Sequence, residues 1–105
     1  MAQKHLLFVT SCRPGEEGAI TAFRLDADKG SLTQTQQYTE VENPFFLALS
    51  PDRKHLYSTH VPGNFNSDNG YVVAFELIDG EGTLRRINQQ SAEGVTICYV
   101  DIDPS

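Results

Sequence analysis

The sequence predicts an all-β fold made of about two blades of a β-propeller. Three observations support this prediction. A pattern of about fifty residues occurs twice, short segments rich in β-branched and aromatic residues alternate with turn residues, and no stretch has the period of an amphipathic helix. Because propeller blades are four-stranded units that repeat every roughly forty to fifty residues, this period favours a propeller over a helical solenoid.

The repeat is clearest in two aligned segments. Gly18-Ala-Ile-Thr-Ala-Phe-Arg-Leu25 matches Gly70-Tyr-Val-Val-Ala-Phe-Glu-Leu77, so Gly, Ala, Phe and Leu recur at a spacing of 52 residues. Gln37 and Gln89 keep that spacing, and 47–51 matches 100–104 after a slip of one residue. We therefore predict one propeller segment over 1–105, with a first repeat of about 1–52 and a second of about 53–105.

Each repeat reads as short strands separated by turn residues. Asp28-Lys29-Gly30 and Asp79-Gly80-Glu81-Gly82 suit hairpins that need positive φ, and Ser50-Pro51-Asp52 suits a type I turn. The predicted strands are 5–11, 18–25, 31–39, 45–50, 54–60, 70–77, 83–90 and 98–102.

The order of these strands is out of phase with whole blades. If 45–50 is the innermost strand of a blade, the chain starts with the last three strands of one blade and continues through a complete one. Segment 98–102 then begins a third blade or supplies the missing strand of the first. Two blades do not close a ring, so we expect strand exchange or a homo-oligomer that buries the exposed edges.

Composition excludes several classes of partner. The net charge is −6, and the 8 Lys and Arg residues are scattered, which argues against nucleic acid and against an anionic membrane surface. The N-terminus lacks the apolar run of a secretory signal, and no segment has the length of a membrane span, so we expect a cytoplasmic protein. We expect Cys12 and Cys98 to be free thiols; a reactive thiol would need a neighbouring His.

One family resemblance covers essentially the whole chain. Segment 41–57, followed by the Gly70-Tyr-Val-Val-Ala-Phe75 and Gly82-Thr-Leu84 blocks, resembles the lactonase-family seven-bladed propellers, which include 6-phosphogluconolactonases and carboxymuconate cyclases. The chain corresponds to about the first third of such a protein. The resemblance implies hydrolysis of a sugar lactone. Where the family commonly has His at the entry of the third blade, this chain has Tyr99.

His60 is the candidate catalytic residue. It ends strand 54–60 at the start of a long loop, which in a propeller lies near the rim of the central funnel. An imidazole with a near-neutral pKa could orient or deprotonate a water that attacks a lactone carbonyl. The alternative is a surface histidine that packs against its own loop.

Three residues are candidate substrate-binding groups. Asn43 could donate to a substrate oxygen, or cap the turn before Pro44. Arg13 could bind a sugar phosphate, or be a solvated loop arginine. Tyr99 could present a phenol to the channel, or pack in the core. His spacing matches no zinc motif, and the Asp26–Gly30 segment lacks the glutamate of a calcium loop, so we predict no metal and no cofactor.

Three functions remain open from the sequence. The chain could be part of a lactone hydrolase that acts on a small lactone or sugar phosphate, and that is incomplete as a single chain. It could be a propeller module that binds ligands or proteins without catalysis. It could also be a truncated or engineered piece whose role is structural and which assembles with copies of itself.

Overall fold

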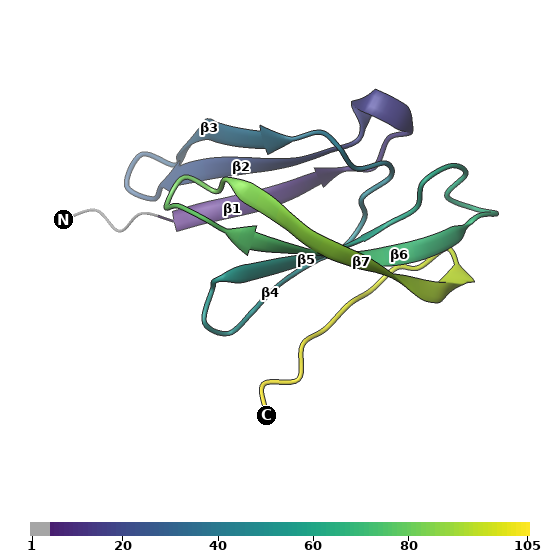
Figure 1. The fold of residues 1–105 in the computed structure, drawn as a ribbon. Coiled ribbons are helices and arrows are strands. Elements are labelled where there is room, and N and C mark those ends of the chain that lie inside the picture. Colours follow the sequence, from purple (N-terminus) through teal and green to yellow (C-terminus); the bar gives the residue numbers. More distant parts are fainter. Residues whose placement is uncertain (1–4) are drawn as a thin grey trace.

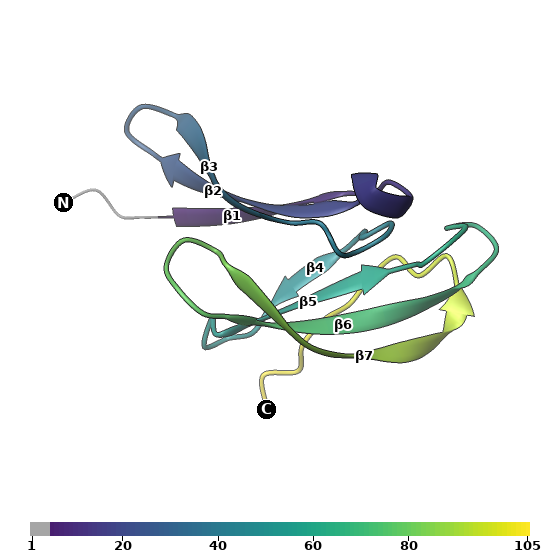
Figure 2. The same cartoon turned by 45° about the horizontal axis from the view of Figure 1, so that its top comes forward.

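Two antiparallel sheets make up the part of the chain that the computed structural model describes, residues 5–105. The first sheet has the order β1-β2-β3 and the second has the order β4-β5-β6-β7. The strands are β1 (His5–Ser11), β2 (Ala19–Asp26), β3 (Ser31–Tyr38), β4 (Leu47–Leu49), β5 (His55–His60), β6 (Asn69–Leu77) and β7 (Leu84–Val95), with a short 3-10 turn η1 (Gly15–Glu17) after β1. The sheets lie one above the other, as neighbouring propeller blades do (Figures 1 and 2). The all-β prediction is confirmed.

The hairpins form where the sequence places turn residues. Between β2 and β3, the Asp26 carboxylate accepts the backbone N–H groups of Asp28 and Lys29 at 3.1 and 3.2 Å. Gly30 has φ of 66° and donates its N–H to the Asp26 carbonyl at 2.8 Å. This left-handed conformation is easy for glycine and strained for most other residues. The turn therefore fixes where β3 begins.

The hydrophobic core lies between the two sheets. Its buried members are Ile20, Val41, Leu56, Val73 and Phe75, and Phe8, Tyr38, Leu47 and Leu84 pack against them. Phe75 has no exposed surface, and its ring meets that of Tyr38 edge-on with 4.9 Å between centroids. Side chains alternate between the faces of a strand, so each sheet presents one face to this core and the other away from it.

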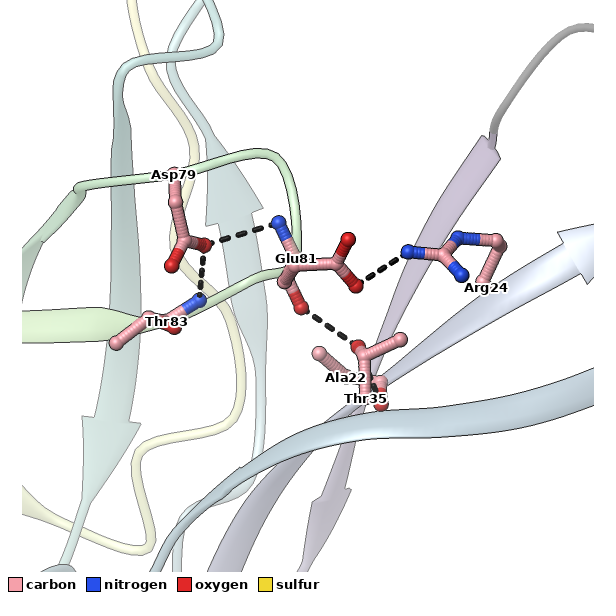
Figure 3. A network of polar contacts seen from close by, with 6 residues as sticks. All are labelled: Ala22, Arg24, Thr35, Asp79, Glu81 and Thr83. Atoms are coloured by element: carbon pink, nitrogen blue, oxygen red, sulfur yellow. Dashed lines mark hydrogen bonds and ion pairs between the residues drawn. The ribbon is translucent and has the colours of Figure 1, made fainter.

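The hairpin between β6 and β7 fastens the second sheet to the first (Figure 3). Thr35 donates its hydroxyl to the Glu81 carbonyl at 2.6 Å, and the Glu81 carboxylate pairs with Arg24. A Cβ on Gly82 would lie 2.5 Å from the Ala22 Cβ, a separation that packed side chains do not reach. Only glycine lets the hairpin backbone come this close to β2.

The crossover between the sheets, residues 39–46, also depends on a glycine. A Cβ on Gly18 would lie 2.2 Å from the carbonyl oxygen of Val41. The backbone N–H of Asn43 donates to the Arg13 carbonyl at 2.8 Å. The crossover is thus tied to the loop after β1 before it enters the second sheet.

The prediction of a strand over 98–102 is wrong. Residues 96–105 form no strand, although β7 runs on to Val95, well past the predicted end at residue 90. A strand needs a partner edge, and this tail runs along the side of the second sheet that faces away from the first (Figures 1 and 2). Tyr99 packs its ring on Phe46 there, at 4.3 Å between centroids.

Candidate functional site

A cleft of about 760 Å³ opens between the crossover and the second sheet where β5 ends. One wall is the crossover, with Glu40 and Glu42, and the η1 turn. The other wall is the second sheet, with His60 from β5 and Arg86 and Gln89 from β7. β5 and β7 are both paired to β6, so the sheet brings together side chains that are far apart in the sequence.

His60 is held rigidly in this cleft. Its residue surface is 5% exposed, and its Nε2 atom lies 2.9 Å from Oε1 of Gln89. Arg86 donates to the same Oε1 atom at 2.5 Å. Since a guanidinium only donates hydrogen bonds, this oxygen is an acceptor, and Nε2 of a neutral His60 then carries the proton. Nδ1 keeps its lone pair, and it is buried without a hydrogen-bond partner.

The environment favours the neutral form of His60. Burial is the main cause that lowers the pKa of His60 below its ordinary value, because desolvation disfavours the charged imidazolium. The positive charge of Arg86 also lowers this pKa. The Gln89 side chain and the Glu42 backbone and charge oppose this shift but do not overcome it. A neutral imidazole with a free lone pair can accept a proton.

The cleft is acidic on one side and basic on the other. Glu16, Glu40 and Glu42 lie on the crossover wall, and Arg86 is the cationic residue in the lining. The Glu42 carboxylate is engaged by the backbone N–H of Gly15 at 2.9 Å. A ligand in the cleft therefore meets an imidazole and a guanidinium on β5 and β7, and carboxylates opposite.

Asn43 lies beside the cleft and holds its wall together. The residue is 5% exposed and has φ of 46°, a conformation that asparagine tolerates better than most residues. Its amide donates to the carbonyl oxygens of Val61 and Gly63 at 3.0 and 2.8 Å. Both amide hydrogens thus tie the crossover to the loop after β5.

None of the three predicted binding residues, Asn43 included, is part of the cleft lining. Arg13 forms an ion pair with Glu17 one turn further along the chain, and its side chain is 62% exposed. Tyr99 is 70% exposed and lies in the tail, stacked on Phe46. Asn43 is bonded through its side chain to Val61, the residue after His60, and through its backbone N–H to the Arg13 carbonyl.

Sequence reasoning missed Gln89, Arg86 and Glu42 as neighbours of His60. One signal was present, because Gln89 repeats Gln37 at the spacing of 52 residues. Gln37 occupies the matching place in the first sheet, opposite Thr21, where its amide donates to the Thr21 hydroxyl at 3.1 Å. Gln89 lies opposite Val73, which offers no polar group, and its side chain bonds to His60 instead. The polar pair of the second sheet is therefore His60 and Gln89.

Other classes of site find no support in the described residues. Among residues 5–105, no three His, Cys, Asp or Glu side chains cluster as a metal site would require. Within the same span, no helix has the length and apolar character needed to cross a membrane. Both cysteines are free, and burial raises the pKa of the Cys12 thiol, which disfavours the reactive thiolate.

Comparison with known proteins gives consistent matches. Residues 6–105 match the family model described as lactonase, 7-bladed beta-propeller. The chain is 26% identical over 100 residues to a 6-phosphogluconolactonase of Bacillus subtilis, covering 95% of this chain and 28% of that protein. It is 30% identical over 96 residues to a 6-phosphogluconolactonase of Formosa agariphila, covering 91% of this chain and 26% of the relative.

A solved structure agrees with these relatives. The crystal structure of a putative 6-phosphogluconolactonase from Bacteroides fragilis superposes with a TM-score of 0.80 at 28% sequence identity. The match covers 98% of this chain and 28% of that one. The chain therefore spans little more than a quarter of the length of the proteins it resembles.

Proposed function

This chain belongs to the lactonase family of seven-bladed β-propellers, and we propose that it supplies part of the site of an enzyme that hydrolyses a sugar lactone. The observation that carries the proposal is the buried His60 in the cleft between the crossover and the second sheet, with its pKa lowered and its Nδ1 lone pair unengaged. Named relatives are 6-phosphogluconolactonases, so the proposed substrate is a lactone of a sugar phosphate. The proposed location is the cytoplasm.

The proposed chemistry uses water as the nucleophile. A water oxygen bonds to the lactone carbonyl carbon while Nδ1 of His60 takes one water proton. The bond between the carbonyl carbon and the ring oxygen then breaks, and the imidazolium returns the proton to that oxygen. The product is an open-chain acid with a free hydroxyl group. Because Nδ1 is buried, this step requires movement of the crossover or of the loop that follows β5.

Gln89 and Arg86 have supporting roles in this proposal. Gln89 fixes the ring so that Nδ1 carries the lone pair, as an orienting group does for other histidine bases. Arg86 is placed to meet a phosphate on the substrate, because it is the cation in the lining and its planar donors suit phosphate oxygens. The remaining blades of the funnel would come from further propeller sequence or from other copies.

The test is the rate at which the protein releases acid from 6-phosphogluconolactone, compared with buffer. The change His60→Gln should lower that rate at least about 100-fold, the usual contribution of a histidine base. The matched control is His55→Gln, at the other end of the same strand, which should leave the rate within about twofold of the unchanged protein. Equal rates for the two variants, or no rate above buffer in the unchanged protein, would reject the proposal.

A second function is supported by a separate observation. Within residues 5–105, strand β1 pairs with β2 alone, and Leu7 and Val9 on it are 38% and 47% exposed. Exposed apolar edge strands favour pairing with another chain. The alternative proposal is a non-catalytic module that assembles with copies of itself, and assembly without turnover of the lactone would favour it.

A further inference from the structure

The lining of the cleft carries more negative than positive charge. Its charged side chains are three carboxylates, on Glu16, Glu40 and Glu42, and one guanidinium, on Arg86. With His60 in its neutral form, the lining therefore has a formal charge of −2, and the whole chain has −6. Because like charges repel, a ligand whose charged groups are all anionic is disfavoured here, even where one of them meets the guanidinium.

Arg86 keeps its positive charge available to a ligand. Three other arginines, Arg13, Arg24 and Arg85, each form an ion pair with a glutamate. Among residues 5–105, Arg86 forms no such pair, and its guanidinium donates instead to the side-chain oxygen of Gln89 at 2.5 Å. Since an amide is neutral, Gln89 orients the guanidinium without cancelling its charge.

Glu42 is held in the same way on the opposite wall. Its carboxylate accepts the backbone N–H of Gly15 at 2.9 Å, and within the described part of the chain it forms no ion pair. The residue is half-buried. A carboxylate can accept about four hydrogen bonds, so the bond from Gly15 fixes its orientation and leaves acceptor capacity for a ligand.

A separate observation marks the space between these walls as a ligand site. His60 lines the cleft, its residue surface is 5% exposed, and its Nδ1 atom has no hydrogen-bond partner. A buried polar atom without a partner costs free energy, which a hydroxyl group of a ligand would recover by donating to it. The cleft thus offers a carboxylate, a neutral acceptor and a guanidinium to one bound molecule.

We propose that this cleft binds a sugar phosphate that also carries an ammonium group, with the phosphate at Arg86 and the ammonium at Glu42. An ammonium group donates three hydrogen bonds and offsets part of the excess negative charge, which a hydroxyl group at the same position does not do. The cleft volume of about 760 Å³ lies in the range of small-molecule sites. The inference rests on the proposed phosphate contact of Arg86, and it does not depend on whether the protein hydrolyses lactones.

Two sugar phosphates test this inference on the unchanged protein. Glucosamine 6-phosphate and glucose 6-phosphate differ at one position, where the first has an ammonium group and the second has a hydroxyl group. Neither is a lactone, so titration calorimetry measures binding without turnover, near neutral pH, at low salt and with a chelator that removes metal ions. Glucosamine 6-phosphate should bind at least about fivefold more tightly, through a charge-assisted hydrogen bond. Equal affinities, tighter binding of glucose 6-phosphate, or no binding of either would overturn the proposal.

The change Glu42→Gln tests the carboxylate. Glutamine keeps the size of the side chain and an oxygen that can accept from Gly15, but it removes the charge. Affinity for glucosamine 6-phosphate should fall at least about fivefold, whereas affinity for glucose 6-phosphate should stay equal or rise because a repulsion is lost. An equal loss for both sugars would contradict a contact with the ammonium group. The matched control is Glu93→Gln, exposed and outside the lining, which should change neither affinity by more than about twofold.

The change Arg86→Gln separates this inference from the proposed function. Both sugars carry the phosphate, so both affinities should fall by a similar factor of about tenfold or more. If they fall but the unchanged protein binds the two sugars equally, the ammonium contact is wrong and the phosphate contact stands. If Arg86→Gln changes neither affinity, the phosphate contact is wrong, and the inference that rests on it is wrong too.

Discussion

At the scale of single residues, the unusual group is a buried histidine whose pKa the fold lowers. His60 is buried between sheet and crossover, with one nitrogen bound to Gln89 and the other unpartnered. Burial of an unpartnered polar atom costs free energy, so a structure that keeps one invites a functional explanation. The two predictions at this scale concern His60 and Arg86, which lies in the same cleft.

The first prediction concerns pH. Because the folded protein lowers the pKa of His60, the unfolded chain binds a proton there at a higher pH than the folded one does. The contribution of His60 to stability is therefore full above its ordinary pKa of about 6.5 and is lost as pH falls below that value. The free energy of unfolding, measured with urea at about pH 7.5 and about pH 5.5, should fall less in His60→Gln than in the unchanged protein.

The control for this titration is His55→Gln, which should keep the full loss of stability on acidification. The difference attributable to His60 has an upper limit of about 1.4 kcal/mol per pH unit. If His60→Gln and His55→Gln respond identically to acid, His60 is not held neutral by the fold.

The second prediction separates two neighbouring arginines. Arg86 lines the cleft and donates to Gln89, whereas Arg85 pairs with Glu76 at 2.7 Å on the other side of β7. Arg86→Gln should raise KM for a phosphorylated lactone about tenfold or more, through loss of a charge-assisted bond, with a smaller effect for the unphosphorylated one. Arg85→Gln should change neither KM by more than about twofold. If Arg86→Gln raises KM equally for both substrates, Arg86 does not bind the phosphate.

At the scale of elements, the β6–β7 hairpin is the part that joins the two sheets. Its backbone accepts from Thr35, and its glycine allows contact with β2. The ion pair between Arg24 and Glu81 adds little, because pairs this exposed contribute at most about 1 kcal/mol. Close backbone packing is thus the main contribution of this hairpin.

Two glycines in the same turn test this point. Gly82 has φ of 88° and no room for a Cβ, whereas a Cβ on Gly80 would meet nothing within 4 Å. Gly82→Ala should lower the free energy of unfolding by more than about 2 kcal/mol, from overpacking together with backbone strain. Gly80→Ala should change it by less than about 1 kcal/mol in the same urea titration. Similar losses in both variants would show that the hairpin does not dock as described.

Sequence reasoning predicted the strands that local chemistry determines. Seven of the predicted strands have counterparts, because alternating apolar residues and turns such as the one ending at Gly30 act over a few residues. The eighth, 98–102, needs an edge that its own chain does not offer, and no local pattern reports the presence of an edge. The sequence also predicted that the last paired strand ends at residue 90. In the structure this strand, β7, stays paired with β6 as far as Val95, which lies opposite Asn69.

The candidate site was harder to predict than the strands. His60 was singled out because it ends a strand next to a long loop, which a sequence displays. Its contact with Gln89 spans 29 residues and depends on two strand registers and a bulge between Ala74 and Phe75. A register shifted by one residue would turn Gln89 away from the cleft, so the pair could be identified only once the sheet was known.

At the scale of the whole molecule, the described residues form two sheets of a propeller family whose members have seven blades. The family relatives are about four times longer than the stretch that this chain matches, so their funnel has more sheets than one copy contains. The exposed apolar residues of β1 form a surface through which a further sheet would join. Both the cleft walls and this surface would then belong to a larger assembly.

The native mass in solution tests this account most directly, by light scattering on a sizing column at several protein concentrations. The self-assembling alternative predicts a defined species larger than one 11.7 kDa chain, which dissociates on dilution. A single copy at every concentration would contradict that alternative, because the open edge of β1 would then be stable without a partner strand.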